Sequence, residues 1–394
     1  HKLRKNIFDK FDLQSRDKKN NESLKHIDKN FLKFNYKFKN NSNQIIYSHN
    51  NNKKIQIRVL DGKILEIKSY DIKKSNIRIN NIKNDNVSAL KKIINYQKLF
   101  NKDYIFDLNA LFLNSGYEIY IGKNQDVDIH IINEVSEKNL TIFQKNIITI
   151  EKNCKVKITE EHFYDKLSNN NLVNHINLEE GGTLDHLIFQ KNKEKANLSQ
   201  TSYANCKKDS KYRQLSLNIS DGSVRNHHYA NFLGENAEAH LDGIFFASSE
   251  NIIDNKTLIN HNLPNCISSQ RYKGILTDKS KASYLSKTFV DRIAQKTEAY
   301  QLSKGILLAD SCSFHSKPEL RIFADDVKCS HGSTIGPIDQ DLLFYLRSRG
   351  LNKKISLAFL IKSLFHDIVS DVKDKSFIEK FNYHSNNWLT QNNI

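Results

Sequence analysis

Short runs of alternating apolar and polar residues recur over residues 45–336. Ile55, Ile57 and Val59 alternate with polar neighbours, and the same alternation returns at 127–131. A period of two is the pattern of a strand with one buried face. Clusters of Asn, Asp, Gly and Lys, which favour turns, separate the runs. We therefore predict many short, half-buried β-strands through most of the chain.

A long series of short strands leaves three architectures open: a sandwich, a barrel and a β-helix. Helical patterns between the strands are scarce apart from a short helix predicted at 89–99, so a doubly wound α/β fold is disfavoured. No repeat is regular enough to identify a β-helix by its spacing. A solenoid would nevertheless hold this many strands in one continuous core, because each turn stacks on the one before it.

The two ends of the chain differ from its middle. Residues 1–44 are charged and rich in Asn, with some apolar residues at helical spacing, and we expect a loosely ordered helical start. Near the other end, 339–349 has acidic residues early, arginines late and Gly350 at its stop, as helix caps and the helix dipole favour. The segment 356–372 then carries an apolar stripe at helical period. The stripe is consistent both with packing on the body and with docking of a partner.

The net charge of +16 raises the question of nucleic-acid binding. The excess is spread along the chain, and Lys, Asn and Ile dominate together, as an A/T-biased coding sequence would produce. The basic clusters at 191–195 and 207–211 lack the interleaved aromatic residues of a nucleic-acid platform. A solvated basic surface is the preferred interpretation, and a nucleic-acid-binding protein stays an alternative.

The apolar and cysteine patterns bear on the compartment. No run approaches the roughly 18 apolar residues of a membrane span, and no charged-then-apolar signal peptide opens the chain. The five cysteines are an odd number, widely spaced and without a CxxC pair, which argues against a disulfide framework. We expect no membrane partner and a reducing compartment, the bacterial cytoplasm, with an organelle stroma as the alternative.

Residues that can carry metal chemistry cluster late in the strand region. Cys329 and His331 would share one face of a strand, because side chains alternate. Thiolate and imidazole ligands suit soft or borderline metals, iron–sulfur species included. An isolated pair of this kind is more often a buried thiol beside a hydrogen-bonded imidazole. With Cys312 and His315 it could furnish four zinc ligands, although the spacing does not match the usual zinc motifs.

Familiar catalytic patterns are missing. Asp325 and Asp326 are adjacent and cannot share a strand face, so we expect turn or salt-bridge residues rather than a glycosidase acid pair. The chain has no GxxxxGK[ST], no GxSxG and no HExxH. We predict a non-catalytic protein without a nucleotide site of its own. A carbohydrate-active β-helix enzyme is the alternative.

Two segments near the end of the chain carry a family signature. They read KPELRIFADDVKCSHGSTIG at 317–336 and LFYLRSRGL at 343–351, and they closely resemble the SufB/SufD family of the SUF iron–sulfur cluster assembly system. Blocks at 272–276 and 294–302 look like preceding family blocks, and weaker similarity extends back to about residue 45. SufB-like chains carry Glu directly after the corresponding His, whereas Gly332 follows here. This favours the SufD branch.

The resemblance implies a right-handed parallel β-helix flanked by helical regions, with divisions at 1–44, 45–337 and 338–394. It also implies a scaffold subunit of a SufBCD complex, which pairs with SufB through the last β-helix turns and docks the SufC ATPase on its helical end. The resemblance favours docking of a partner as the role of the stripe at 356–372. ATP hydrolysis is expected in SufC, which agrees with the missing P-loop.

By the same comparison, Cys329 and His331 match the Cys-x-His pair that SufD contributes to the interface where a nascent cluster is assembled. His331 is the stronger candidate for a transient iron or cluster ligand, and Cys329 is a second ligand or an interface thiol. The expected cargo is therefore iron or an iron–sulfur cluster shared with SufB. The resemblance also allows reduced flavin in the complex and a homodimer of the isolated chain. Cys312 and His315 match no signature position.

Overall fold

The computed structural model describes residues 44–49, 54–69, 76–82, 104–193 and 195–394. The helix expected at 89–99 lies outside these ranges, as does nearly all of the helical start expected over 1–44. Among the described residues, no helix is long and apolar enough to cross a membrane.

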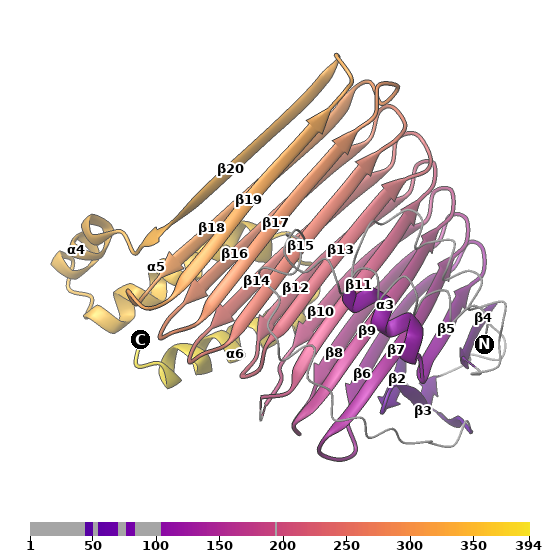
Figure 1. Cartoon of the computed structure of the whole chain (residues 1–394), viewed down its shortest axis with the longest axis horizontal. Coiled ribbons are helices and arrows are strands. Elements are labelled where there is room, and N and C mark those ends of the chain that lie inside the picture. The colour runs from indigo at the N-terminus through magenta and orange to yellow at the C-terminus, as the bar shows by residue number, and fades with distance from the viewer. Residues whose placement is uncertain (1–43, 50–53, 70–75, 83–103, 194) are drawn as a thin grey trace.

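The described strands form two large sheets (Figure 1). The 11-stranded sheet, called the large sheet below, has this spatial order: β1 (Ile46–His49), β3 (Lys63–Ser69), β2 (Ile55–Leu60), β6 (Asp126–Glu134), β8 (Lys155–Phe163), β10 (Thr183–Gln190), β12 (Lys211–Ile219), β14 (Glu238–Ala247), β16 (Ile267–Leu276), β18 (Thr297–Leu307) and β20 (Val327–Pro337). The 9-stranded sheet, called the small sheet, has this order: β19 (Ser313–Ile322), β17 (Lys281–Val290), β15 (Ile252–His261), β13 (Val224–Phe232), β11 (Asn197–Cys206), β9 (Ser168–Leu178), β7 (Leu140–Ile150), β5 (Ser115–Ile121) and β4 (Ile77–Asn81).

From β5 onward the chain alternates between the two sheets, and each strand pairs in parallel with the strand two further along. Stacked neighbours in the middle of the molecule, such as Asn177 and Asn205, lie 28 residues apart in sequence. Near the end the spacing is 30, as between Glu298 and Lys328. The fold is therefore a parallel β-helix, as the resemblance predicted. Antiparallel pairs β2–β3 and β4–β5 occur only at its N-terminal end among the described strands.

Apolar side chains stack in register along the inside of the helix. One row on the small sheet runs through Ile148, Ile176, Ala204, Ala230 and Ile259, all of them fully or almost fully buried. Full burial of one such isoleucine contributes about 1.5–3 kcal/mol. The alternation seen in the sequence is thus the inward face of successive turns, and a one-residue slip would turn every such row outward.

The interior also contains charge. The Glu160 side chain is buried, its Oε2 atom is 3.0 Å from His186 Nε2, and its Oε1 atom is 3.3 Å from His162 Nε2. Burial by itself would raise the pKa of Glu160, but the two imidazoles hold it well below its usual range. An ionised carboxylate is tolerated in this core because it is paired.

Asparagine has two structural roles in this fold. Asn124 and Asn153 lie in turns with φ of 57° and 56°, a left-handed conformation that Asn tolerates better than most residues. On the outer face of the small sheet, Asn205 donates to Asn177 at 3.0 Å and Asn231 donates to Asn205 at 3.4 Å. Part of the Asn content therefore has structural roles in this fold.

Helices cover the outer faces of both sheets (Figure 1). Helix α3 (Tyr104–Phe112) lies on the small sheet against β7 and β9, where Asn109 Nδ2 donates to the carbonyls of Gln144 and Asn171. Helix α4 (Gln340–Ser348) follows β20 and is capped by Asp339, whose Oδ1 accepts from two backbone N–H groups. Its position confirms the helix predicted at 339–349.

Helices α5 (Lys353–Val369) and α6 (Lys375–Gln391) fold back onto the large sheet. Ile361, Phe365 and Ile368 of α5 are buried in one cluster with residues of β10, β12, β14 and β16. The buried part of the stripe predicted at 356–372 therefore packs on the body, which was one of the two interpretations of the stripe. The reason is that the outer face of these strands is itself apolar and needs a cover.

Candidate functional site at the open edge of the last turn

The last turn of the β-helix ends in two edge strands. Among the described strands, β20 pairs only with β18 and β19 pairs only with β17. β19 and β20 lie side by side at the end of the stack (Figure 1). Each edge presents backbone N–H and C=O groups that can pair with another strand, and monomeric proteins normally protect such edges.

Strand β20 directs Cys329 and His331 toward the inside of this open turn. In the parallel register, Cys329 is opposite Ala299 and His331 is opposite Gln301. Ala299 is fully buried and Gln301 is 3% exposed, so both rows belong to the interior. The two side chains therefore share the inward face, as strand alternation predicts.

The Cys329 thiol is half-buried in an apolar setting. It packs against a small cluster formed by Val290, Ala294 and Ala324. Burial raises the pKa of the Cys329 thiol, and a hydrogen bond with the Ala299 backbone opposes this only in part. Near neutral pH the group is a neutral thiol, so a bound metal or a partner's cation must supply the driving force for the thiolate.

His331 is exposed at the end of a polar stack. Behind it, Gln301 Nε2 donates to Thr288 Oγ1 at 2.8 Å and to the Glu319 carbonyl at 3.2 Å, and Gln301 Oε1 accepts from Ser286 at 3.1 Å. Because three hydrogen bonds hold Gln301, the floor beneath the imidazole is rigid. The opposite side of His331 is the open edge.

Gly332 leaves the outer side of this strand bare. A Cβ atom at position 332 would meet only Leu302 Cδ1, at 3.6 Å, which is ordinary contact. At Gly336 an added Cβ would meet nothing within 4 Å. Nothing within the described chain therefore requires glycine at either position. Small residues at an edge are suited to the close approach of another backbone.

The other predicted ligands lie elsewhere. Cys312 is buried beside Phe314 in a separate cluster, and its thiol donates to the Ala309 carbonyl at 3.0 Å. His315 follows Phe314 on β19 and therefore lies on the opposite, outer face of that strand. The four-ligand zinc site is wrong, since no three His, Cys, Asp or Glu side chains among the described residues can hold a metal ion.

Asp325 and Asp326 are turn residues, as the sequence predicted. They lie exposed in the connection between β19 and β20, where the Asp326 N–H donates to Gln295 Oε1 at 2.9 Å. This bond ties the last turn to the turn before it. No acid pair for hydrolysis forms at this position.

Exposed apolar side chains also lie in the turn before β20 and on helices α4 and α5, and sequence reasoning did not identify them. Phe323 beside the edge is 57% exposed, and on α4 and α5 the exposed fractions are 73% for Phe344, 54% for Tyr345 and 60% for Phe359. The group Phe344, Tyr345 and Phe359 is called the helical apolar surface below. The sequence does contain a signal that could have identified this surface. It is a run of large apolar residues on a helix too short to bury all of them.

A family model described as "SUF system FeS cluster assembly, SufBD core domain" matches residues 130–364, which is more than half of the chain. The chain belongs to the SufBD family. The SufBD core extends from β6 into α5 and includes both edge strands, Cys329, His331 and α4.

Individual relatives agree with the family match. The SufBD protein is 27% identical over 301 residues to the iron–sulfur cluster assembly SufBD family protein slr0076 of Synechocystis, covering 72% of this chain and 66% of that protein. It is 33% identical over 155 residues to the iron–sulfur cluster assembly protein SufD of Escherichia coli, covering 39% and 37%. It is 27% identical over 228 residues to the chloroplastic protein ABCI7 of Arabidopsis thaliana, covering 57% and 47%. The chain thus spans less than two thirds of the length of these relatives.

Proposed function

We propose that this SufBD protein is a SufD-type scaffold subunit whose open edge pairs with SufB to form the site of iron–sulfur cluster assembly. The observation that carries the proposal is the position of Cys329 and His331 on the inward face of an edge strand that is paired on one side only. Strand addition to an exposed edge is a common mode of protein association, because the backbone supplies the hydrogen bonds. Family membership in the SUF system supports the same assignment.

The pair supplies only part of a binding site for iron or a cluster. Cys329 and His331 provide at most two ligands, and no third His, Cys, Asp or Glu completes a site among the described residues. Iron–sulfur clusters take four thiolate or imidazole ligands, so the remaining ligands would come from the partner. The cargo would also displace the thiol proton of Cys329, since a metal binds the thiolate.

We place SufC docking on the helical apolar surface. Phe344, Tyr345 and Phe359 are exposed, while the neighbouring Phe365 is buried against the large sheet. Large exposed aromatic side chains are typical anchors of protein interfaces. The chain itself would remain non-catalytic, with ATP hydrolysis carried by SufC.

Co-expression with SufB and SufC tests the scaffold role. We expect the three chains to co-purify, and we expect His331→Ala to leave the complex assembled while cluster formation, followed by absorbance and iron content, falls by at least about tenfold. His315→Ala, on the outer face of the neighbouring edge strand, is the matched control and should leave cluster formation unchanged. The proposal fails if the wild-type chain elutes without the other two.

The same edge would also form a homodimer when the chain is alone, because a second copy of β20 presents the same unpaired groups. Sedimentation of the isolated chain at increasing concentration tests this. Addition of SufB should then convert the homodimer into the heterodimer, since both use one edge.

A further inference from the structure

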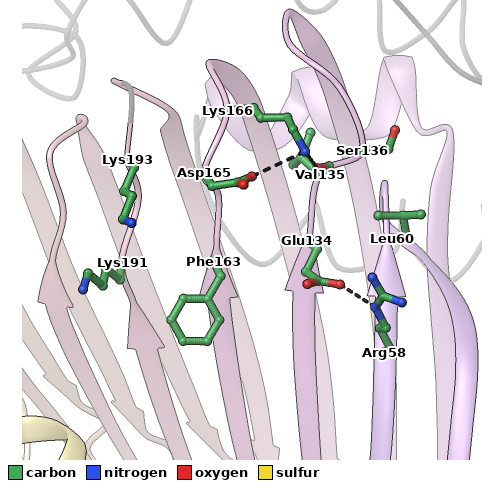
Figure 2. A pocket seen from close by; sticks show the side chains of 10 residues that line it. All are labelled: Arg58, Leu60, Glu134, Val135, Ser136, Phe163, Asp165, Lys166, Lys191 and Lys193. Atoms are coloured by element: carbon green, nitrogen blue, oxygen red, sulfur yellow. Dashed lines mark hydrogen bonds and ion pairs between the residues drawn. The ribbon is translucent and has the colours of Figure 1, made fainter.

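A cavity of about 550 Å³ opens where β2, β6, β8 and β10 end, away from the edge carrying Cys329 and His331 (Figure 2). Its size falls within the usual range of small-molecule sites. The described residues that line it are Arg58, Leu60, Glu134, Val135, Ser136, Phe163, Asp165, Lys166, Lys191 and Lys193.

The lining has more positive than negative charge. Arg58 is paired with Glu134 at 2.5 Å. Lys166 lies 3.6 Å from Asp165 and also donates to the Val135 carbonyl at 3.1 Å. These pairs use both acidic residues of the described lining, so the charges of Lys191 and Lys193 are in excess.

A histidine of α6 holds the side chain of Lys191 in place. The Lys191 Nζ atom lies 3.0 Å from Nδ1 of His384 on α6. Burial, with the charges of Lys191 and Lys380 nearby, lowers the pKa of His384 to about 4, so at neutral pH the imidazole is uncharged and accepts a hydrogen bond. Burial and the charge of Lys193 also lower the pKa of Lys191. An anion in the cavity would relieve this repulsion.

An aromatic ring forms the other part of the wall. Phe163 lies between the Arg58–Glu134 ion pair on one side of the cavity and the two lysines on the other (Figure 2). Its orientation is set by an edge-to-face contact with Phe189, with ring centroids 5.9 Å apart and an interplanar angle of 68°. Leu60 and Val135 add further apolar surface. The cavity therefore combines an apolar wall with a cationic one.

We propose that this cavity binds a small phosphate ester, with its phosphate between Lys191 and Lys193 and its organic part against Phe163. Two ammonium groups can both donate to one phosphate, and charge-assisted hydrogen bonds of this kind are the stronger ones. A cavity of this size with an apolar wall beside its lysines fits a small molecule. The site is independent of the cluster-assembly edge.

Calorimetric titration of the full chain at low salt, with phenyl phosphate and inorganic phosphate as probes, tests the proposal. We expect phenyl phosphate to bind more tightly than inorganic phosphate, because only the ester reaches Phe163. Lys191→Gln/Lys193→Gln should weaken both probes by at least about tenfold. Phe163→Leu should weaken phenyl phosphate and leave inorganic phosphate unchanged.

Lys279→Gln is the matched control, since it removes one exposed positive charge from a distant turn. Lys193 is exposed, so the single variant Lys193→Gln should fold and can be tested even if the double variant unfolds. The proposal is overturned if Lys279→Gln weakens binding as much as the lysine pair does, because bulk charge would then be responsible. The proposal is also overturned if a single-stranded oligonucleotide competes with phenyl phosphate to the same degree in the wild type and in the folded lysine variants. Binding would then not depend on the two lysines.

Discussion

Buried titratable side chains determine how the folding stability of this protein falls at acidic pH. His261 lies in the interior, its Nε2 atom 2.8 Å from Ser268 Oγ, and burial lowers its pKa from 6.5 to about 3. Between those two pH values the unfolded chain binds a proton that the folded chain does not. Folding stability from this residue is therefore complete above pH 6.5 and is lost as the pH falls toward 3.

We predict that His261→Gln makes the stability less dependent on pH. Between pH 7 and pH 5 the wild type should lose about 2 kcal/mol of unfolding free energy through His261 alone. The variant lacks a group that titrates in this range and should keep that amount. Urea unfolding at the two pH values measures the difference. Equal pH dependence of the variant and the wild type would contradict the role of His261.

Thiol reactivity should distinguish one cysteine from the other four. Cys154, Cys206, Cys266 and Cys312 are buried, and Cys329 is half-buried. Under native conditions we expect iodoacetamide to label Cys329 alone, because the others are shielded. Labelling of Cys329 should be slower than that of a free thiol at pH 7 and should accelerate as pH rises, since its pKa is raised. Mass spectrometry of the peptides checks both statements.

At the scale of elements, α5 serves two purposes with its two faces. Phe365 is fully buried among the large-sheet strands, whereas Phe359 is 60% exposed on the same helix. The helix is anchored by Lys273, whose Nζ donates to the Leu364 carbonyl at 2.8 Å and pairs with Asp367 at 2.5 Å. One face holds the helix on the sheet and the other remains available to a partner.

The two phenylalanines make a matched pair of variants. Phe365→Ala should lower the unfolding free energy by about 3–5 kcal/mol, because it removes a fully buried ring. Phe359→Ala should change it by less than about 0.5 kcal/mol but should weaken binding to SufC. Denaturant unfolding and a SufC pull-down separate the effects. If Phe359→Ala leaves SufC binding intact, the helical apolar surface is not the docking site.

Sequence periodicity predicted the elements better than their contacts. The alternation at Ile55–Val59 and the stripe at 356–372 both correspond to real strands and helices. Which surface covers the stripe could not be predicted, because that surface consists of outward residues on strands distant in the sequence, such as Phe189 and Phe246. Helix α3 was also missed, since nine residues carry too little periodicity.

In the candidate site, too, local features were predicted and long-range contacts were not. Cys329 and His331 were predicted to share a face, because alternation within one strand is a local property. Cys312 and His315 were wrongly grouped with them, since their neighbours depend on the winding of the whole helix. The cavity beside Phe163 was not found either, because its lining comes from four segments that are separate in sequence, at the ends of β2, β6, β8 and β10.

At the scale of the whole molecule, the open edge should decide assembly. Gly332 tolerates a side chain within this chain, since only Leu302 would contact an added Cβ. We predict that Gly332→Glu leaves the melting temperature within a few degrees of the wild type but weakens pairing with SufB by at least about tenfold, because bulk and charge now occupy the edge. Size-exclusion chromatography with SufB measures the pairing. Unchanged pairing would mean that the contact lies elsewhere.

The fold-back of the C-terminal helices has a consequence for cooperativity. In a stacked solenoid each turn contacts only its neighbours, so end turns can open independently of the rest. Helices α5 and α6 reach back across the stack: Lys273 of β16 holds α5, and Lys380 of α6 pairs with Glu161 of β8. Because these ties bridge turns that do not touch, we expect the middle of the stack to open as one unit. Strands β19 and β20 each pair on one side only, so we expect the Cys329 and His331 side chains to become fully ordered only if another chain pairs with this edge.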